Sequence, residues 1–177
     1  SIIKGTSGVN KKIIDIEEYV SLNKERGQTK VPERLREKYY AEAERYQAYI
    51  QDNGYWDSID LARECYKILE SGEHDFPLYD FMACDEVQDL AEVEILTLLN
   101  LVSDVSNEFG PRLERMFFTG DTAQVINPSG FTWKGLKRLL SKQSGRKGEE
   151  MMDPIHLARN FRSTEQIVEL TNAALET

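Results

Sequence analysis

Apolar positions in the first part of the chain recur every three or four residues, which is the spacing of amphipathic helices. Pro32 fits the first position of a long helix that ends before Gly54, and its aromatic stripe is predicted to pack onto the rest of the protein. A shorter helix is predicted to begin at Asp57 and to end near Gly72. Residues 1–72 are therefore expected to form a helical segment.

The pattern changes from helical spacing to short apolar runs after this segment. Leu78–Cys84 is almost continuously apolar, as expected for a strand that is buried on both faces of a parallel sheet. Arg115–Thr119 and Pro154–Ala158 are predicted as the second and third strands, and a helix is expected after each of the three. This alternation predicts an α/β fold in which residues 73–177 form a parallel sheet flanked by helices.

A polar cluster follows each predicted strand. The clusters are Asp85-Glu86, Gly120–Gln124 and Arg159–Arg162. Ligands of parallel α/β sheets bind beyond the carboxyl ends of the strands. The sequence therefore predicts that the three clusters converge on one edge of the sheet, where a ligand would bind.

Each cluster has a chemical interpretation and a plainer one. Asp85 and Glu86 could hold Mg²⁺ and activate a water molecule, or they could simply form an exposed turn or helix start. Gln124 could bind a γ-phosphate or its attacking water, or end a Gly-Asp turn. Arg162 could contact the transferred phosphate, although it could also be a surface residue and Arg159 competes for the role.

The residue types of the clusters and their order along the chain resemble the motifs of a known family. Asp85–Asp89 resembles the Asp-Glu-x-Gln-Asp box, motif II, of UvrD/Rep-like superfamily 1 helicases. Gly120–Gln124 is similar to their Gly-Asp-x-x-Gln motif III, and Asn160–Thr164 to their Asn-Tyr-Arg-Ser-Thr motif IV. Asp57–Leu61 looks like the Asp-Phe-Asp-Asp-Leu segment that precedes the box, so the resemblance covers residues 57–172. The closest likeness is to a divergent branch of large UvrD-like proteins.

This resemblance implies a partial RecA-like (P-loop NTPase) motor domain in residues 73–177 and an accessory-subdomain-like helical segment in residues 1–72. It implies an ATP-dependent helicase, which hydrolyses ATP and moves along single-stranded DNA or RNA. ATP and Mg²⁺ are the implied cofactors. The partners that it implies are the nucleic acid and the remainder of the helicase core.

The resemblance also assigns roles to individual residues. Asp85 would bind Mg²⁺ together with Glu86, and Glu86 would activate the attacking water. Gln124 would sense the γ-phosphate and Arg162 would contact it. Gln88–Asp89 would couple hydrolysis to movement on the nucleic acid.

An aromatic residue after the motif III glutamine stacks on a base in this family, a contact of about 1–3 kcal/mol. Trp133, followed by Lys134, is the candidate. The segment Asn127–Gly130 is inserted before it, which shifts the alignment, and Trp133 or Phe131 could equally be a core residue.

The sequence departs from the family pattern in two places. It contains no Gly-x-x-x-x-Gly-Lys-Ser/Thr loop, and the motifs that should follow Arg162 are absent. We therefore expect a piece of a longer protein that does not turn over ATP alone. Two alternatives stay open: a helicase-like interaction or regulatory module without hydrolysis, and a Mg²⁺-dependent nuclease that uses Asp85, Glu86 and Asp89.

Composition limits the kind of nucleic-acid contact. The chain has 22 Lys and Arg against 31 Asp and Glu, a net charge of −9, so a DNA contact must be local or supplied by other parts of the protein.

Two cysteines without metal-ligand spacing favour a reducing compartment, the cytosol or the nucleus. Because no apolar run approaches the roughly 18 residues of a membrane helix, no membrane partner is expected.

Overall fold

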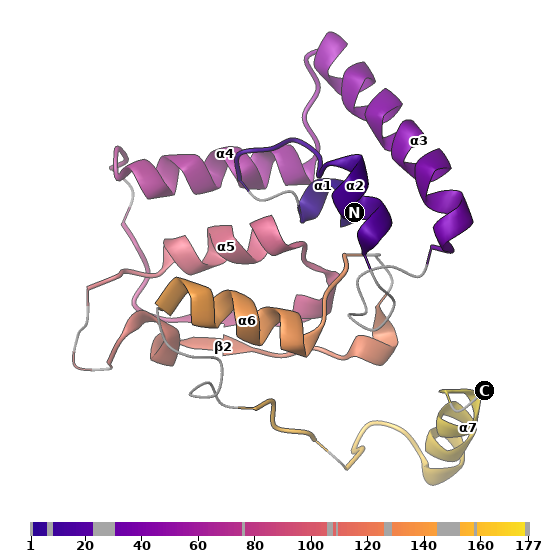
Figure 1. The fold of residues 1–177 in the computed structure, drawn as a ribbon. Helices are drawn as coiled ribbons and strands as arrows, with labels where there is room; N and C mark the ends of the chain where they lie inside the picture. The colour runs from indigo at the N-terminus through magenta and orange to yellow at the C-terminus, as the bar shows by residue number, and fades with distance from the viewer. Residues whose placement is uncertain are drawn as a thin grey trace. The chain divides into compact units, whose positions relative to one another are not determined.

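The protein has a helix-rich α/β fold, seen here in a computed structural model that describes residues 2–6, 9–22, 31–75, 77–105, 108, 110–125, 129–144, 153–157 and 159–175 (Figure 1). It divides into two compact units, residues 1–136 and 137–177. The helices are α1 (Ile2–Gly5), α2 (Ile16–Ser21), α3 (Glu33–Asp52), α4 (Ser58–Ser71), α5 (Glu92–Leu101), α6 (Trp133–Ser144) and α7 (Glu165–Leu175). Within the described part of the chain, none of the helices has the length and apolar character needed to cross a membrane. The division predicted between residues 72 and 73 stays a prediction.

The three N-terminal helices share a small core. Ile3, Ile14, Tyr19 and Tyr40 are buried together. The Tyr40 hydroxyl donates to the Ile14 carbonyl at 2.9 Å, which fixes α3 against the connection between α1 and α2. The burial of these side chains holds three separate helices in one cluster.

The aromatic stripe of α3 was predicted to pack inward, and this is wrong for two of its members. Tyr39 and Tyr46 are 52% and 48% exposed. The buried face is centred about one residue further along, on Arg36, Tyr40, Gln47 and Ile50. A shift of one residue rotates a helix by about 100°, which is enough to turn the stripe toward solvent.

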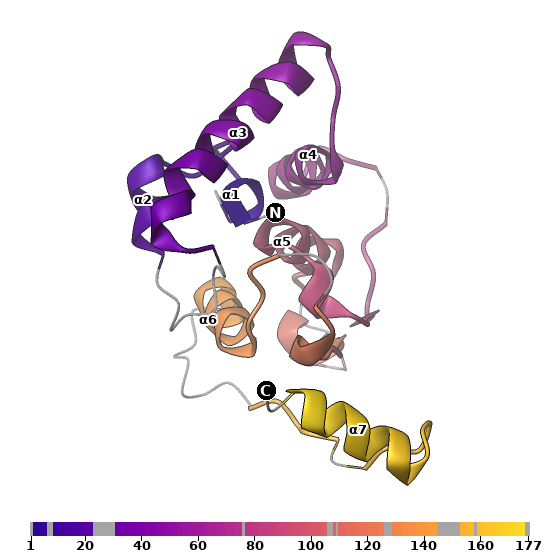
Figure 2. The same ribbon diagram turned by 90° about the vertical axis from the view of Figure 1, so that its right-hand side faces the viewer.

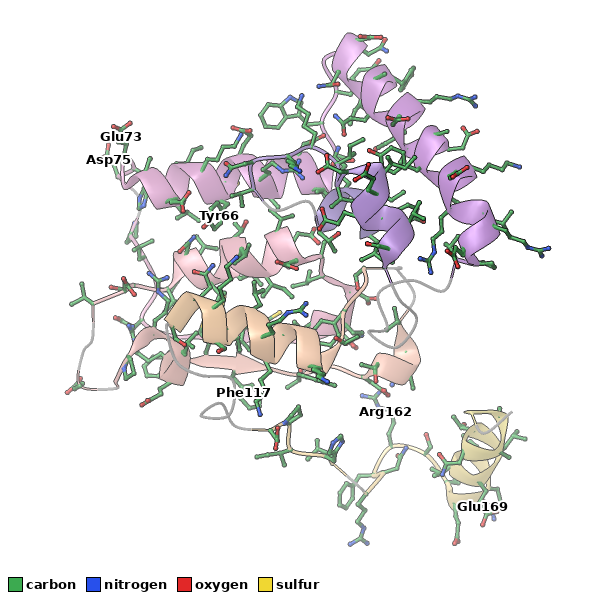
Figure 3. All side chains as sticks on the ribbon, in the orientation of Figure 1. Tyr66, Glu73, Asp75, Phe117, Arg162 and Glu169 are labelled. Carbon is green, nitrogen blue, oxygen red and sulfur yellow. The ribbon has the colours of Figure 1, made fainter. Side chains whose placement is uncertain are left out.

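The shorter helix predicted from residue 57 to residue 72 is confirmed as α4. The Asp57 side chain accepts from the Asp60 amide at 3.0 Å and caps the helix, while Gly72, at φ 70°, ends it. Helix α4 packs against α5, and α5 lies between α4 and the sheet in two perpendicular views (Figures 1 and 2). The labelled Tyr66 side chain lies on the side of α4 that faces α5 (Figure 3).

The sheet has two parallel strands, β1 (Met82–Cys84) and β2 (Met116–Phe118), with Ala83 opposite Phe117. The first two predicted strands are therefore confirmed in shortened form. Residues 154–157 form no strand, and their neighbour Ala158 lies outside the described residues. Ile155 and Leu157 are 82% and 93% exposed, so no sheet partner covers their apolar side chains.

The first strand was also predicted to be buried on both faces, and this is wrong. Phe81, the residue before β1, is 53% exposed, and Phe117 on β2 is 64% exposed. Figure 3 shows Phe117 on the side of β2 away from α5. Helix α5 covers one face of the sheet, and the uninterrupted apolar run identified a parallel strand without indicating how many layers cover it.

Candidate functional site

Asp85 is the first residue after β1, and its position is fixed by the neighbouring strand. Its Oδ1 atom accepts hydrogen bonds from the Thr119 hydroxyl, at the end of β2, and from the Glu86 amide at 2.9 Å. The Thr119 hydroxyl and then the Glu86 amide hold the pKa of Asp85 below its ordinary value. An exposed carboxylate that is ionised at neutral pH therefore stands at the carboxyl end of the sheet.

Glu86 has a left-handed backbone, with φ 53° and ψ 37°, and it alone among the described non-glycine residues has a positive φ. This turn allows the next amide, of Val87, to donate to the Thr119 carbonyl at 3.0 Å. Left-handed backbone in a non-glycine residue costs about 1–3 kcal/mol and is concentrated at functional sites. The strain marks Glu86 as a functional candidate on geometric grounds.

Gln88 joins the acidic segment to the second polar segment. It is only 1% exposed, its Nε2 donates to Glu86 Oε2 at 2.7 Å, and its Oε1 accepts from the Asp121 amide at 3.0 Å. A Cβ at Gly120 would lie 2.5 Å from that Oε1 atom, so residue 120 has no room for a side chain. The buried amide thus holds both segments in a fixed relation.

The second segment is ordered by Asp121, which caps a 3-10 helix, η4 (Thr122–Gln124). Asp121 Oδ1 accepts from the Ala123 amide at 2.9 Å, and Oδ2 accepts from Gln124 Nε2 at 2.8 Å. Gln124 is exposed. Hydrogen bonds therefore run from Glu86 through Gln88 and Asp121 to Gln124.

The predicted nucleic-acid residues lie just beyond this segment. Ser129 is 4% exposed, and its hydroxyl donates to the Gln88 carbonyl at 2.6 Å and accepts from the Phe131 amide at 3.2 Å. The Phe131 and Trp133 rings meet edge to face with centroids 5.3 Å apart. Trp133 is partly buried at the start of α6, whereas Lys134 is exposed.

The remaining predicted residues are placed differently. Asp89 ends the 3-10 helix η2 (Val87–Asp89), where its amide donates to the Glu86 carbonyl at 3.0 Å. Arg162 belongs to the second unit, where it is exposed in a turn closed by Asn160 Oδ1, which accepts from the Arg162 amide at 2.8 Å (Figure 3). The Arg159 guanidinium lies 4.9 Å from the centre of the Phe161 ring, so it has a local contact of its own. Convergence of Arg162 with the first two clusters stays a prediction.

The donor set fits a hydrated Mg²⁺ better than a closed metal cage. Within the described ranges, no three His, Cys, Asp or Glu side chains come together as a metal site. The two hydrogen bonds of Asp85 both engage Oδ1, and the residue is exposed, so its carboxylate keeps the capacity to bind a metal ion. Mg²⁺ keeps several waters and is commonly held by one or two carboxylates, so Asp85 suits it.

Sequence reasoning missed two residues that organise the site. The Thr119 hydroxyl donates a hydrogen bond to Asp85, and the sequence feature that could have identified it is its position at the end of a predicted strand. The Ser129 hydroxyl, in the inserted segment, donates to the Gln88 carbonyl. The only sequence feature that could have pointed to it is the departure of this segment from the family pattern.

Comparisons with protein-family models, curated proteins and solved structures found no match to this chain. The resemblance to UvrD/Rep-like helicases therefore rests on the short sequence segments alone, which are Asp57–Leu61, Asp85–Asp89, Gly120–Gln124 and Asn160–Thr164. What the structure adds is the hydrogen-bonded connection of Asp85–Asp89 to Gly120–Gln124 through Gln88.

Proposed function

We propose that this chain is part of the ATP-driven motor of a nucleic-acid helicase of the UvrD/Rep-like superfamily 1 type, built on a RecA-like (P-loop NTPase) domain. The observation that carries the proposal is the Gln88 side chain, which bonds to Glu86 at 2.7 Å and to the Asp121 amide at 3.0 Å. A solvated acidic turn would not require a buried amide between these segments. Such a buried amide is expected in a site that must hold a carboxylate and a phosphate-sensing amide at a fixed separation.

The proposed chemistry uses the exposed groups of the first unit. Asp85, together with Glu86, would hold Mg²⁺, and the ion would supply positive charge to the phosphate oxygens. Glu86 accepts a proton from the attacking water, and the hydrogen bond from Gln88 Nε2 fixes its orientation. Gln124 donates to the γ-phosphate or positions the water. The phosphate contact of Arg162, which belongs to the second unit, stays an expectation of the family resemblance.

Nucleic-acid binding is assigned to the aromatic segment after the glutamine. Trp133 would stack on a base of single-stranded DNA or RNA, and the exposed Lys134 would contact a phosphate. The net charge of −9 confines such a contact to a local surface. The phosphate-binding loop would come from the remainder of the helicase core.

The test is ATP hydrolysis by the intact protein, with and without single-stranded oligo(dT). Glu86→Gln keeps the shape of the side chain and removes the base, so we expect the turnover rate to fall by about 100-fold or more. Glu169→Gln is the matched control, because Glu169 is an exposed glutamate on α7, and it should leave turnover unchanged (Figure 3).

Unchanged hydrolysis in the Glu86→Gln protein would overturn the catalytic assignment. Cleavage of DNA by the wild-type protein with Mg²⁺ and no ATP would replace the helicase proposal by the nuclease alternative. A wild-type protein that neither hydrolyses ATP nor cleaves DNA would favour the interaction module.

A further inference from the structure

The inserted segment before the aromatic pair contains a buried polar side chain that the proposed chemistry does not use. Ser129 is 4% exposed, yet its hydroxyl makes two hydrogen bonds, to the Gln88 carbonyl at 2.6 Å and from the Phe131 amide at 3.2 Å. The first bond joins residues 41 positions apart in the sequence. Ser129 is thus the direct hydrogen-bonded connection between the acidic segment and the aromatic pair.

We propose that Ser129 is a positioning residue, which transmits the binding of single-stranded DNA at Phe131 and Trp133 to Glu86 through Gln88. This inference rests on the proposed function, because it assumes that Glu86 acts on ATP and that Trp133 contacts the nucleic acid. Its distinct content is that the hydroxyl of an inserted residue couples the two events.

The Gln88 end of this connection is tightly constrained. Gln88 is 1% exposed, and its carbonyl accepts from Ser129 while its side chain bonds to Glu86 and to Asp121. A buried amide that loses any of these partners leaves an unsatisfied polar group, which is costly. Displacement of the Gln88 backbone therefore moves the amide that orients the Glu86 carboxylate.

The aromatic end is constrained as well. The Phe131 amide is held by Ser129, and the Thr132 hydroxyl oxygen accepts from the Gly135 amide at 2.9 Å at the start of α6. Trp133 lies between these two anchors in the sequence, and its ring is in edge-to-face contact with Phe131. A base stacked on Trp133 would therefore act on a segment that is hydrogen-bonded to the Gln88 carbonyl through Ser129.

Ser71 offers an unusually close control. Its hydroxyl donates to the Ile68 carbonyl at 2.9 Å and accepts from the Glu73 amide two residues further on at 3.2 Å. Like Ser129, Ser71 donates to one carbonyl and accepts from the amide two residues further on, but both of its bonds are local and it is exposed at the end of α4. Ser71→Ala therefore removes the same type of bonds without breaking the connection.

The experiment measures the ratio of ATP hydrolysis with oligo(dT) to hydrolysis without it, in the intact protein below its melting temperature. Ser129→Ala should lower this ratio by about tenfold, within the range of allosteric couplings. It should also raise the oligo(dT) concentration for half-maximal stimulation. Ser71→Ala should change both quantities by less than about twofold. Ser129→Thr and Ser129→Val have the same shape and differ only in the hydroxyl, so the Thr variant should be stimulated and the Val variant should not.

Three results would overturn the role of Ser129. The first is equal stimulation of the Thr and Val variants. The second is a parallel fall of basal and stimulated rates in Ser129→Ala, and the third is a Val variant that fails to fold where the Thr variant folds. Either of the last two means that the hydroxyl only stabilises the fold. If the wild-type protein does not hydrolyse ATP, or if oligo(dT) does not stimulate its hydrolysis, the proposed function itself is contradicted.

Discussion

Two acidic pairs of the first unit look alike in sequence and behave differently in the structure. Asp57 and Asp60, at the start of α4, have side chains 23% and 15% exposed, and Lys4 Nζ lies 2.8 Å and 2.5 Å from their carboxylates. Asp85 and Glu86, after β1, are exposed, and no ion pair among the described residues involves them. The first pair is neutralised inside the fold, whereas the charge of the second remains available to a ligand.

The buried pair has a structural task. Arg63 also approaches Asp60, at 3.3 Å, and donates to the Lys4 carbonyl at 2.9 Å, while the Tyr46 hydroxyl reaches Asp57 at 3.1 Å. These contacts fasten α1 and α3 to the start of α4. Asp57 and Asp60 therefore cap α4 and pair with buried charges, and the comparison predicts large stability effects there and small ones at Asp85 and Glu86.

The largest effect is expected from Lys4→Met, which leaves two largely buried carboxylates without their ammonium partner. We expect a loss of about 3 kcal/mol in the free energy of unfolding. Lys11→Met is the control, because its ion pair with Asp15 joins side chains that are 53% and 66% exposed, and its urea midpoint should stay at the wild-type value. Equal midpoints for the two variants would break the distinction between the regions.

The next effect tests whether the exposed pair depends on close packing beneath it. Gly120→Ala would place a Cβ 2.5 Å from Gln88 Oε1 and 3.1 Å from Val87 Cγ1, so we expect a loss of about 1–3 kcal/mol and of ATP hydrolysis. Gly54→Ala, at φ 66° with nothing within 4 Å, should lose about 1 kcal/mol from backbone strain and keep full hydrolysis. Wild-type hydrolysis in Gly120→Ala would show that the Gln88 connection is dispensable.

The pH dependence of stability separates the pairs further. Burial alone would raise the pKa of Asp57, but hydrogen bonds from Lys4, the Asp60 amide and Tyr46 together lower it. A lowered folded-state pKa gives stability that is present above the unfolded value, about 3.9, and is lost as the pH falls through the folded value. The urea midpoint of the wild-type protein should therefore fall as the pH is lowered from about 5 to about 2. Asp57→Asn should reduce this dependence on pH more than Asp85→Asn does, because the Asp85 carboxylate has a lowered pKa but is fully exposed. The reverse order would contradict the comparison.

The smallest effect is expected at the exposed pair itself. Glu86→Gln should leave the urea midpoint of the protein unchanged, because the amide can keep the contact with Gln88 by turning its oxygen toward Nε2. A clear loss of stability in this variant would mean that Glu86 supports the fold, as Asp57 does.

Local features of this fold could be predicted from the sequence, and long-range ones could not. Helix α4 was predicted with its cap and its glycine end, because both signals lie within the segment. The bond from the Asp121 amide to Gln88 spans 33 positions and that from Ser129 spans 41, and no local pattern encodes such pairings. The first two strands were found but shortened and the third was not confirmed, since an apolar run indicates a strand and leaves the number of its neighbours open.

The candidate site shows the same limit. Three clusters were predicted to converge at one edge of the sheet. The structure brings two of them, Asp85–Asp89 and Gly120–Gln124, together through the Gln88 hydrogen bonds, and the convergence of the third stays a prediction. The buried position of Gln88 and the positive φ of Glu86 were invisible in the sequence, because they depend on how the turn after β1 closes on Thr119.

The most direct test of the account is a double-mutant cycle on ATP turnover in the intact protein, with Glu86→Gln, Gln124→Ala and the two combined. If the two segments act as one catalytic unit, each single change lowers turnover by about 100-fold, and the double variant is less than about tenfold slower than the slower single. Independent losses that multiply in the double variant, or full turnover in Gln124→Ala, would contradict the claim that Gln88 joins the two segments into one site.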